Sequence, residues 1–377
     1  MRSILVVLCF LILSACAPRG FMSYSAPEQA GAAVLKRVYS ISNRQFDPNF
    51  AGGGSYNDGT PKSKNLYSQN LSGKRADDMN FTRLDISLPP SHQLGEIEWP
   101  KWQEANVEKH FAVRHEETFN SAEGFLGSLR AEPANGEVVL FVHGYNVNLS
   151  EAVYRMAQLS NDYELDMPVI SFSWPSAANA AGYIYDRDSV VFSRDALENI
   201  LKALVRDGHK IALVGHSMGS QLIMETLRQM SIAGDTAVLH NLARVILMSP
   251  DIDEDVFLAQ SERIDPFPKN FVLLVSRQDR ALGLASMITG RPNRLGSIES
   301  PDVLRHLPIT IIDMSHVRGG DALGHSKALT APRAIAQLTG LTQLTGQAES
   351  QRAYEESNIS LCVAVRGPEL CLQQVAQ

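Results

Sequence analysis

The 377-residue chain has few cysteines, no surplus of basic residues and no apolar run long enough to cross a membrane as a helix. Four cysteines are too few for a disulfide scaffold and argue against a zinc cluster. Lys and Arg total 34 against 41 Asp and Glu, and this net charge of −7 argues against broad nucleic-acid binding, which needs a basic face. The apolar run at residues 4–13 is too short to span about 30 Å of hydrocarbon at about 1.5 Å per residue.

The overall composition is that of a globular protein. Hydrophobic residues make up 44% of the chain and charged residues 20%, which excludes disordered, collagen-like and coiled-coil proteins. At about 150 residues per domain the length predicts two or three domains, although one large α/β domain can also fill it.

The N-terminus has the features of an export signal. Arg2 precedes the apolar run, which ends in the small residues of Leu13-Ser14-Ala15-Cys16. This ending resembles the lipobox of bacterial lipoproteins, which implies that residues 1–15 are removed and that Cys16 carries acyl chains. Ala17 in place of an aspartate implies, for a diderm source, delivery to the outer membrane facing the periplasm. An ordinary cleaved signal with an incidental cysteine is the alternative.

The remaining chain divides by composition. The tail contains Cys362 and Cys371, which we expect to form a disulfide in an oxidising envelope, two free thiols being the alternative. The expected regions are a tether at 16–35, an N-terminal region at 36–135 with edge strands and a flexible loop over 51–75, a catalytic core at 136–345 and a tail at 346–377.

From residue 137 onward, short continuous apolar runs alternate with amphipathic helical patterns. Such runs are typical of strands buried on both faces, as in a parallel sheet. We therefore predict an α/β fold with a mostly parallel central sheet and helices on both faces. The predicted strands cover 36–42, 81–88, 138–142, 169–174, 211–214, 245–248, 271–275 and 309–312, and the clearest helix covers 197–205.

A G-x-S-x-G motif follows one predicted strand directly and precedes a helical pattern. Its residues are Gly215, His216, Ser217, Met218 and Gly219. Strand, turn and helix are the context that a nucleophile elbow requires, in which the glycines allow a sharp turn and close backbone approach. A tight turn with a capping serine is the alternative. His216 points away from the serine in such a turn and is not expected to act as the base.

The sequence His143-Gly144-Tyr145-Asn146 follows an earlier buried strand. Acyl transfer at a serine needs two backbone N–H donors for the oxyanion of the tetrahedral intermediate. We expect these from Met218, the residue after the nucleophile, and from Tyr145 in this loop.

These motifs together resemble the α/β-hydrolase superfamily, and more narrowly a bacterial group of uncharacterised esterase- and lipase-like members. The matching segments are VLFVHGYN, SFSWPS, VGHSMGS and the later GHS at 324–326. The resemblance implies the chain order serine, acid, histidine, and hence Ser217 as nucleophile, Asp279 as acid and His325 as base. No metal or organic cofactor is implied.

Other assignments remain open. Asp253, and less so Asp251, follow a predicted strand at which some family members carry the acid, and His306 and His316 compete with His325 for the role of base. The apolar stretch at 283–307 is interpreted either as a lid or pocket wall or as a short element packed on the core.

The predicted function is a serine hydrolase of carboxylesterase or lipase type, anchored through Cys16 in the bacterial cell envelope and acting on a small-molecule or lipid ester. The same triad used on thioesters or peptides, or for acyl transfer, is one alternative. A non-catalytic binding or scaffold protein on the same fold is the other.

Overall fold

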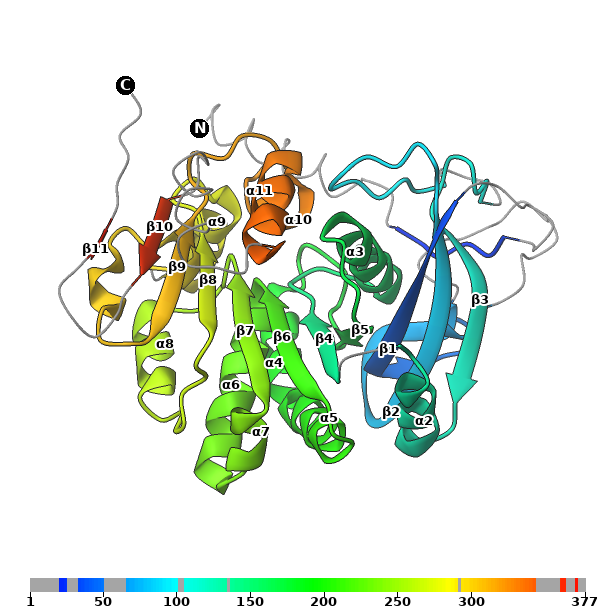
Figure 1. Cartoon of the computed structure of the whole chain (residues 1–377), viewed down its shortest axis with the longest axis horizontal. Coiled ribbons are helices and arrows are strands. Elements are labelled where there is room, and N and C mark those ends of the chain that lie inside the picture. Colours follow the sequence, from blue (N-terminus) through cyan, green and yellow to red (C-terminus); the bar gives the residue numbers. More distant parts are fainter. Residues whose placement is uncertain are drawn as a thin grey trace.

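The computed structural model describes residues 20–25, 33–50, 66–100, 105–133, 136–290, 293–343, 360–363 and 370–371. The expected export signal and the lipobox cysteine lie outside these residues. One twisted sheet runs through the molecule (Figure 1), with the strand order β11-β10-β9-β8-β7-β6-β4-β5-β1-β2-β3.

All neighbouring strands from β9 to β1 are parallel, and antiparallel strands flank them on both sides. The mostly parallel sheet predicted from the short apolar runs is therefore confirmed. The described strands are β1 (Val34–Phe46), β2 (Leu71–Leu88), β3 (Ala112–Phe119), β4 (Glu137–Val142), β5 (Val169–Ser173), β6 (Lys210–His216), β7 (Leu242–Met248), β8 (Phe271–Val275), β9 (Ile309–Asp313), β10 (Ser360–Val363) and β11 (Leu370–Cys371).

Helices cover both faces of the sheet, because alternate side chains of each central strand point to opposite faces. In β4, Val138 and Leu140 join one hydrophobic cluster, whereas Val139 and Phe141 join the other. Helices α2 (Ala122–Arg130), α4 (Tyr183–Phe192), α5 (Arg194–Arg206), α6 (Met218–Ala233), α7 (Thr236–His240), α8 (Glu254–Ser261) and α9 (Arg280–Thr289) contribute to the first cluster, and α3 (Leu149–Asp162), α10 (Lys327–Thr330) and α11 (Pro332–Gln343) to the second. Three short 3₁₀ turns complete the described elements, namely η1 (Tyr67–Asn70), η2 (Leu295–Ser297) and η3 (Pro301–Leu304).

The described part of the expected tether is not free chain. Residues 20–25 pack onto the body, where Met22 is buried and the backbone of Ser23 and Ser25 forms hydrogen bonds of 2.8 and 3.0 Å with Val113. The amide of Ser23 also donates to the hydroxyl oxygen of Tyr154 at 3.2 Å. A short backbone pairing with β3 thus replaces the tether expected at these positions.

The prediction of a flexible loop over 51–75 is wrong for the last residues of this range. Residues 67–70 form η1, and residues 71–75 begin β2, whose antiparallel pairing with β1 includes Arg44 opposite Arg75. This part of β2 is rich in Gly, Lys, Arg and Asp, which are poor strand formers, so cross-strand pairing and not local propensity fixes its conformation. Residues 51–65 lie outside the described residues.

At the other end of the sheet, the described part of the tail adds two short strands. β10 pairs with β9, and β11 pairs with β10 in a register that sets Cys362 opposite Cys371. A disulfide between these two cysteines remains a prediction. The backbone register suits it, because directly opposed antiparallel residues have Cα atoms about 4.5–5.5 Å apart, which lies within the range that disulfides span.

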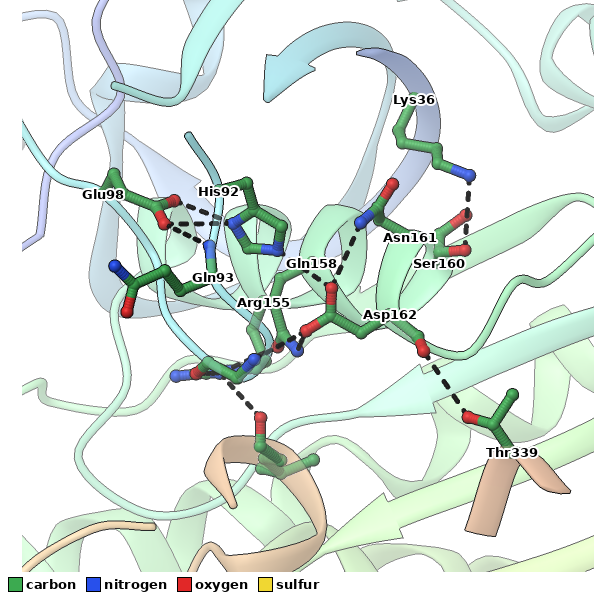
Figure 2. A network of polar contacts seen from close by, with 12 residues as sticks. Lys36, His92, Gln93, Glu98, Arg155, Gln158, Ser160, Asn161, Asp162 and Thr339 are labelled. Carbon is green, nitrogen blue, oxygen red and sulfur yellow. Dashed lines mark hydrogen bonds and ion pairs between the residues drawn. The ribbon is translucent and has the colours of Figure 1, made fainter. Parts of the chain in front are cut away.

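A polar network joins α3 to the segment after β2 and to the C-terminal helices (Figure 2). His92 lies between two carboxylates, 2.9 Å from Glu98 and 2.8 Å from the buried Asp162. Asp162 also accepts hydrogen bonds from the backbone of Gly95 and the side chain of Gln158. Arg155 donates to the carbonyls of Gly95 and Leu329, both at 3.2 Å, and Leu329 belongs to α10. The network therefore connects three segments that are far apart in the sequence.

Within the described ranges, no helix is both long enough and apolar enough to cross a membrane.

Candidate active site

Ser217 lies between β6 and α6 in a strained backbone conformation. Its φ is 53° and its ψ is −122°, a region that non-glycine residues rarely occupy. Main-chain bonds hold it there, since its amide donates to Met248 O at 3.0 Å and its carbonyl accepts from the amides of Ser220 and Asp251. Strand, turn and helix thus form the elbow geometry that the motif predicted.

Two glycines let the neighbouring backbone pack against this turn. A Cβ added at Gly219 would lie 2.3 Å from the carbonyl oxygen of Val142, and one at Gly144 would lie 2.9 Å from Ser217 Cβ. Larger residues at either position would push the loop after β4 away from the elbow. The G-x-S-x-G and His-Gly segments are therefore adjacent in space.

Asp279 and His325 are in direct contact. Asp279 caps the N-terminus of α9, where its Oδ1 accepts from Leu282 N at 3.0 Å. Its other oxygen, Oδ2, lies 2.7 Å from His325 Nδ1. Burial alone would lower the pKa of His325, but the hydrogen bond to Asp279, with the nearby charges of Asp251 and Asp321, raises that pKa above its ordinary value.

Two charged residues, Asp321 and Lys327, hold the loop that carries His325 in place. Neither of them was assigned to the site from the sequence. Asp321 accepts hydrogen bonds from the backbone amides of Leu323, His325 and Ser326. The buried Lys327 donates to Ser276 Oγ and to the carbonyls at the end of β9, Met314 O at 3.0 Å and Ser315 O at 3.2 Å.

The backbone of His325 also meets the elbow. The carbonyl oxygen of His325 lies 3.5 Å from His216 Nε2, and the two rings are 4.8 Å apart. Burial lowers the pKa of His216 well below its ordinary value, so this imidazole stays neutral. Among the described residues no hydrogen bond joins Ser217 Oγ to His325, a contact that often tightens only when substrate binds.

The loop from His143 to Val147 is held by buried charges of opposite sign. Asp186 accepts from the amide of Asn146 at 3.0 Å, and Arg44 donates to the carbonyl of Val147 at 2.9 Å. Burial raises the pKa of Asp186. Tyr145, in the middle of this loop, packs its ring edge-on against Tyr183 with centroids 5.4 Å apart.

His143 itself is a structural residue. It stacks on the buried Trp174 with ring centroids 4.8 Å apart, and Trp174 Nε1 donates to His143 O at 2.8 Å. Burial, with the nearby charge of Arg44, lowers the pKa of His143 to about 3, so it is neutral. The SFSWPS segment, which contains Trp174, therefore packs against the start of the loop after β4.

The alternative acids have other partners. Asp253 caps α8 by accepting from the amides of Asp255 and Val256. Asp251 accepts from Tyr183 Oη at 2.8 Å and lies 3.4 Å from Arg294. Neither forms a hydrogen bond with His325 in the described part of the chain.

The alternative bases are likewise not brought to the elbow. His306 and His316 have no hydrogen bond to Ser217 or to Asp279 among the described residues.

A polar cavity of about 640 Å³ opens beside Asp279. Gly283 and Ser286 of α9 line one side of it, and Arg277, Arg294, Glu254 and Glu299 bring charges of both signs. Ser217 and His325 are not among its lining residues, so this cavity reaches Asp279 but does not contain the nucleophile or the base.

The apolar stretch over 283–307 is partly packed on the core, as one of the two interpretations expected, and partly exposed. Leu295, Ile298 and Leu304 are buried in the core, whereas Met287 and Ile288 of α9 point into solvent.

Comparisons with solved structures return distant likenesses. Phospholipase PlaB from Legionella pneumophila is 13% identical, with a TM-score of 0.37 over 59% of this chain and 62% of that one. A predicted CIB-like hydrolase from Thermoplasma acidophilum is 15% identical, with a TM-score of 0.35 over 55% of this chain and 86% of that one. The chain thus covers less than two thirds of the Legionella protein. No curated protein sequence matches it.

A family model gives the decisive match. Residues 120–342, more than half of the chain, match the model described as alpha/beta hydrolase of unknown function (DUF900). This range contains the elbow, the loop after β4 and the Asp279–His325 pair. The resemblance and the fold class inferred from the sequence motifs are confirmed, and the chain belongs to this family of alpha/beta hydrolases.

Proposed function

We propose that this hydrolase cleaves carboxylic esters with Ser217, His325 and Asp279 as a catalytic triad. The observation that supports this most directly is the 2.7 Å contact between His325 Nδ1 and Asp279 Oδ2. A carboxylate at Nδ1 fixes the tautomer in which Nε2 is free to accept a proton. An unassisted serine hydroxyl is a weak nucleophile near neutral pH. The raised pKa of His325 makes its imidazole a stronger base for removing the proton of the Ser217 hydroxyl.

The proposed reaction has two steps. Ser217 Oγ attacks the ester carbonyl carbon while His325 Nε2 takes the hydroxyl proton and then delivers it to the departing alkoxide, which leaves as the alcohol. Water then attacks the acyl-enzyme, His325 takes one of its protons, and the carboxylic acid leaves as Ser217 recovers a proton.

The oxyanion of each tetrahedral intermediate is assigned to two backbone donors. Met218 is the first residue of α6, so its N–H has no partner within the helix. Tyr145 N is the second donor, in the loop that Asp186 and Arg44 hold against the elbow. Fixed donors stabilise developing charge without reorganising at the moment of reaction.

Covalent labelling tests the nucleophile. We expect a fluorescent fluorophosphonate to modify Ser217 alone, as located by peptide mass spectrometry, and Ser217→Ala to remove both the label and esterase turnover. Ser220→Ala is the matched control, because Ser220 lies one turn away with its hydroxyl donating to Gly215 O at 3.0 Å. Full turnover in folded Ser217→Ala protein would refute the proposal.

We further propose that lipid on Cys16 anchors the protein in the bacterial cell envelope, as the lipobox resemblance implies. Cells fed radiolabelled palmitate are expected to label the wild-type protein, and Cys16→Ser is expected to abolish the label. Cys9→Ser is the control, because Cys9 falls in the segment expected to be removed. Label retained in Cys16→Ser would refute the anchor.

A further inference from the structure

Helix α9 presents an apolar stripe to solvent. Leu284, Met287 and Ile288 follow the i, i+3, i+4 spacing that places side chains on one helix face, and Met287 is 80% and Ile288 60% exposed. The helix has a second apolar face, where Leu282 and Ala285 are buried. No charged residue occurs between 281 and 289. A contiguous exposed apolar surface of this kind marks an interaction site more often than scattered single residues do.

The stripe begins at the rim of the candidate active site. Asp279, which contacts His325, is the N-cap of α9, and the next amide, that of Arg280, donates to Leu323 O at 2.9 Å. Leu323, in the loop that carries His325, is itself exposed. Helix α9 lies beyond the carboxyl ends of the neighbouring strands (Figure 1).

Another exposed apolar side chain lies near the oxyanion loop, the segment from His143 to Val147 that carries the proposed donor Tyr145. Ile184, at the start of α4, is 60% exposed. The preceding residue, Tyr183, packs against the ring of Tyr145. Exposed apolar residues therefore occur beside both the acid and the oxyanion loop of the site.

The N-terminal chain reaches the body at this same edge. Asn148 Nδ2 donates to Gly20 O at 2.8 Å, and Gly20 N donates to Glu151 at 3.2 Å, so Gly20 is fixed at the start of α3. Asn148 directly follows Val147, the last residue of the oxyanion loop. Cys16 is only four positions before Gly20, and four residues span at most about 14 Å. Lipid on Cys16 would therefore hold the membrane close to the carboxyl edge of the sheet.

We propose that this edge of the sheet faces the bilayer, with the α9 stripe in the lipid surface, and that the substrate is an acyl ester of a membrane lipid. The inference rests on the proposed function. Ser217 would take the acyl group, the remainder of the lipid would leave as an alcohol with the proton delivered by His325, and water would release the fatty acid. The apolar face of α9 and the lipid anchor would both strengthen membrane binding, because each adds apolar area that is buried in the membrane.

Depth-dependent quenching tests the orientation. The full-length lipidated protein is reconstituted into phosphatidylethanolamine–phosphatidylglycerol vesicles whose acyl chains are brominated. Met287→Trp is compared with Ile232→Trp, because Ile232 is also exposed, at 53%, but lies near the far end of α6, about 22 Å along the helix from the elbow. We expect bromine to quench the added tryptophan at 287 and not the one at 232. No quenching at 287 would overturn the proposal.

Activity tests the substrate class separately. We compare hydrolysis of vesicle lipid with hydrolysis of soluble p-nitrophenyl butyrate in Met287→Glu/Ile288→Glu and in the control Ile232→Glu. The ratio of the two rates is expected to fall about tenfold or more in the α9 variant and to stay unchanged in the control.

The outcomes separate this inference from the function on which it rests. Butyrate cleaved and vesicle lipid left intact by the wild type would overturn the lipid substrate and leave the hydrolase standing. Quenching at 287 with no ester cleaved would support the orientation and refute the hydrolase. A dimer that dissociates in Met287→Glu/Ile288→Glu, with no quenching at 287, would overturn the inference and assign the stripe to a second copy of the chain.

Discussion

Replacing Asp279 by asparagine is expected to lower kcat for ester hydrolysis by about 10⁴-fold while the fold is retained. The amide keeps the shape of the carboxylate and can still cap α9 through its carbonyl oxygen. It cannot hold His325 in the tautomer that leaves Nε2 ready to accept a proton. Because Asp279 raises the pKa of His325, the acid limb of the pH–rate profile should also move to lower pH in this variant.

Asp253→Asn is the matched control for this prediction. Asp253 also caps a helix after a strand, and it was the alternative acid, but its oxygen accepts from the backbone of α8 and not from His325. We expect its kcat to stay within about twofold of the wild type, as for a surface change away from the site. If Asp253→Asn abolished turnover and Asp279→Asn did not, the acid would have to be reassigned.

Replacing Asp162 by alanine is expected to reduce the free energy of unfolding by about 3–5 kcal/mol, the usual cost of removing one member of a buried charge pair. The change leaves His92 Nε2 and the amide of Gly95 without their buried acceptor, while His92 Nδ1 keeps Glu98. Urea unfolding followed by circular dichroism measures the loss. Asp166→Ala is the control, because Asp166 is exposed on the following loop, and it should change the value by less than about 0.5 kcal/mol. An equal effect of both changes would contradict the role given to the network.

The same network predicts that the free energy of unfolding decreases at alkaline pH. Burial alone would lower the pKa of His92, but the hydrogen bonds to Asp162 and Glu98 raise it to about 9. Above about pH 6.5 the unfolded chain has lost this proton while the folded protein keeps it, so the stabilisation declines as pH rises to about 9. This part of the decline should be smaller in Asp162→Ala, where Glu98 alone raises the pKa of His92.

The parallel strands were predictable because burial on both faces leaves a local trace in the sequence. Runs such as those of β4 and β8 are continuous and apolar, and turn residues delimit them. The start of β2 has no such trace, because partner strands stabilise its polar residues. Residues 20–25 are also held by contacts to Val113 and Tyr154, which lie far along the chain.

Part of the site geometry was also predictable. The family resemblance implied that Asp279 and His325 act together, and the structure places the two in contact at 2.7 Å, each in a segment that follows a strand of the parallel sheet. Single charged residues that support the site leave no local pattern. Arg44 in β1 contacts the carbonyl of Val147 across 103 positions of sequence, which no spacing rule connects.

The parallel pairing of β1 with β5 also has a consequence for how the chain reaches its fold. Ser42 in β1 donates to Ser173 O in β5 across 131 positions, so an early strand finds its interior neighbour only after almost half of the chain has been made. Sheets built from such distant pairings form slowly, because loop closure must precede the contacts that stabilise it. Until β5 has been made, the edge of β1 that pairs with it has no partner strand, and exposed strand edges of this kind are prone to aggregation.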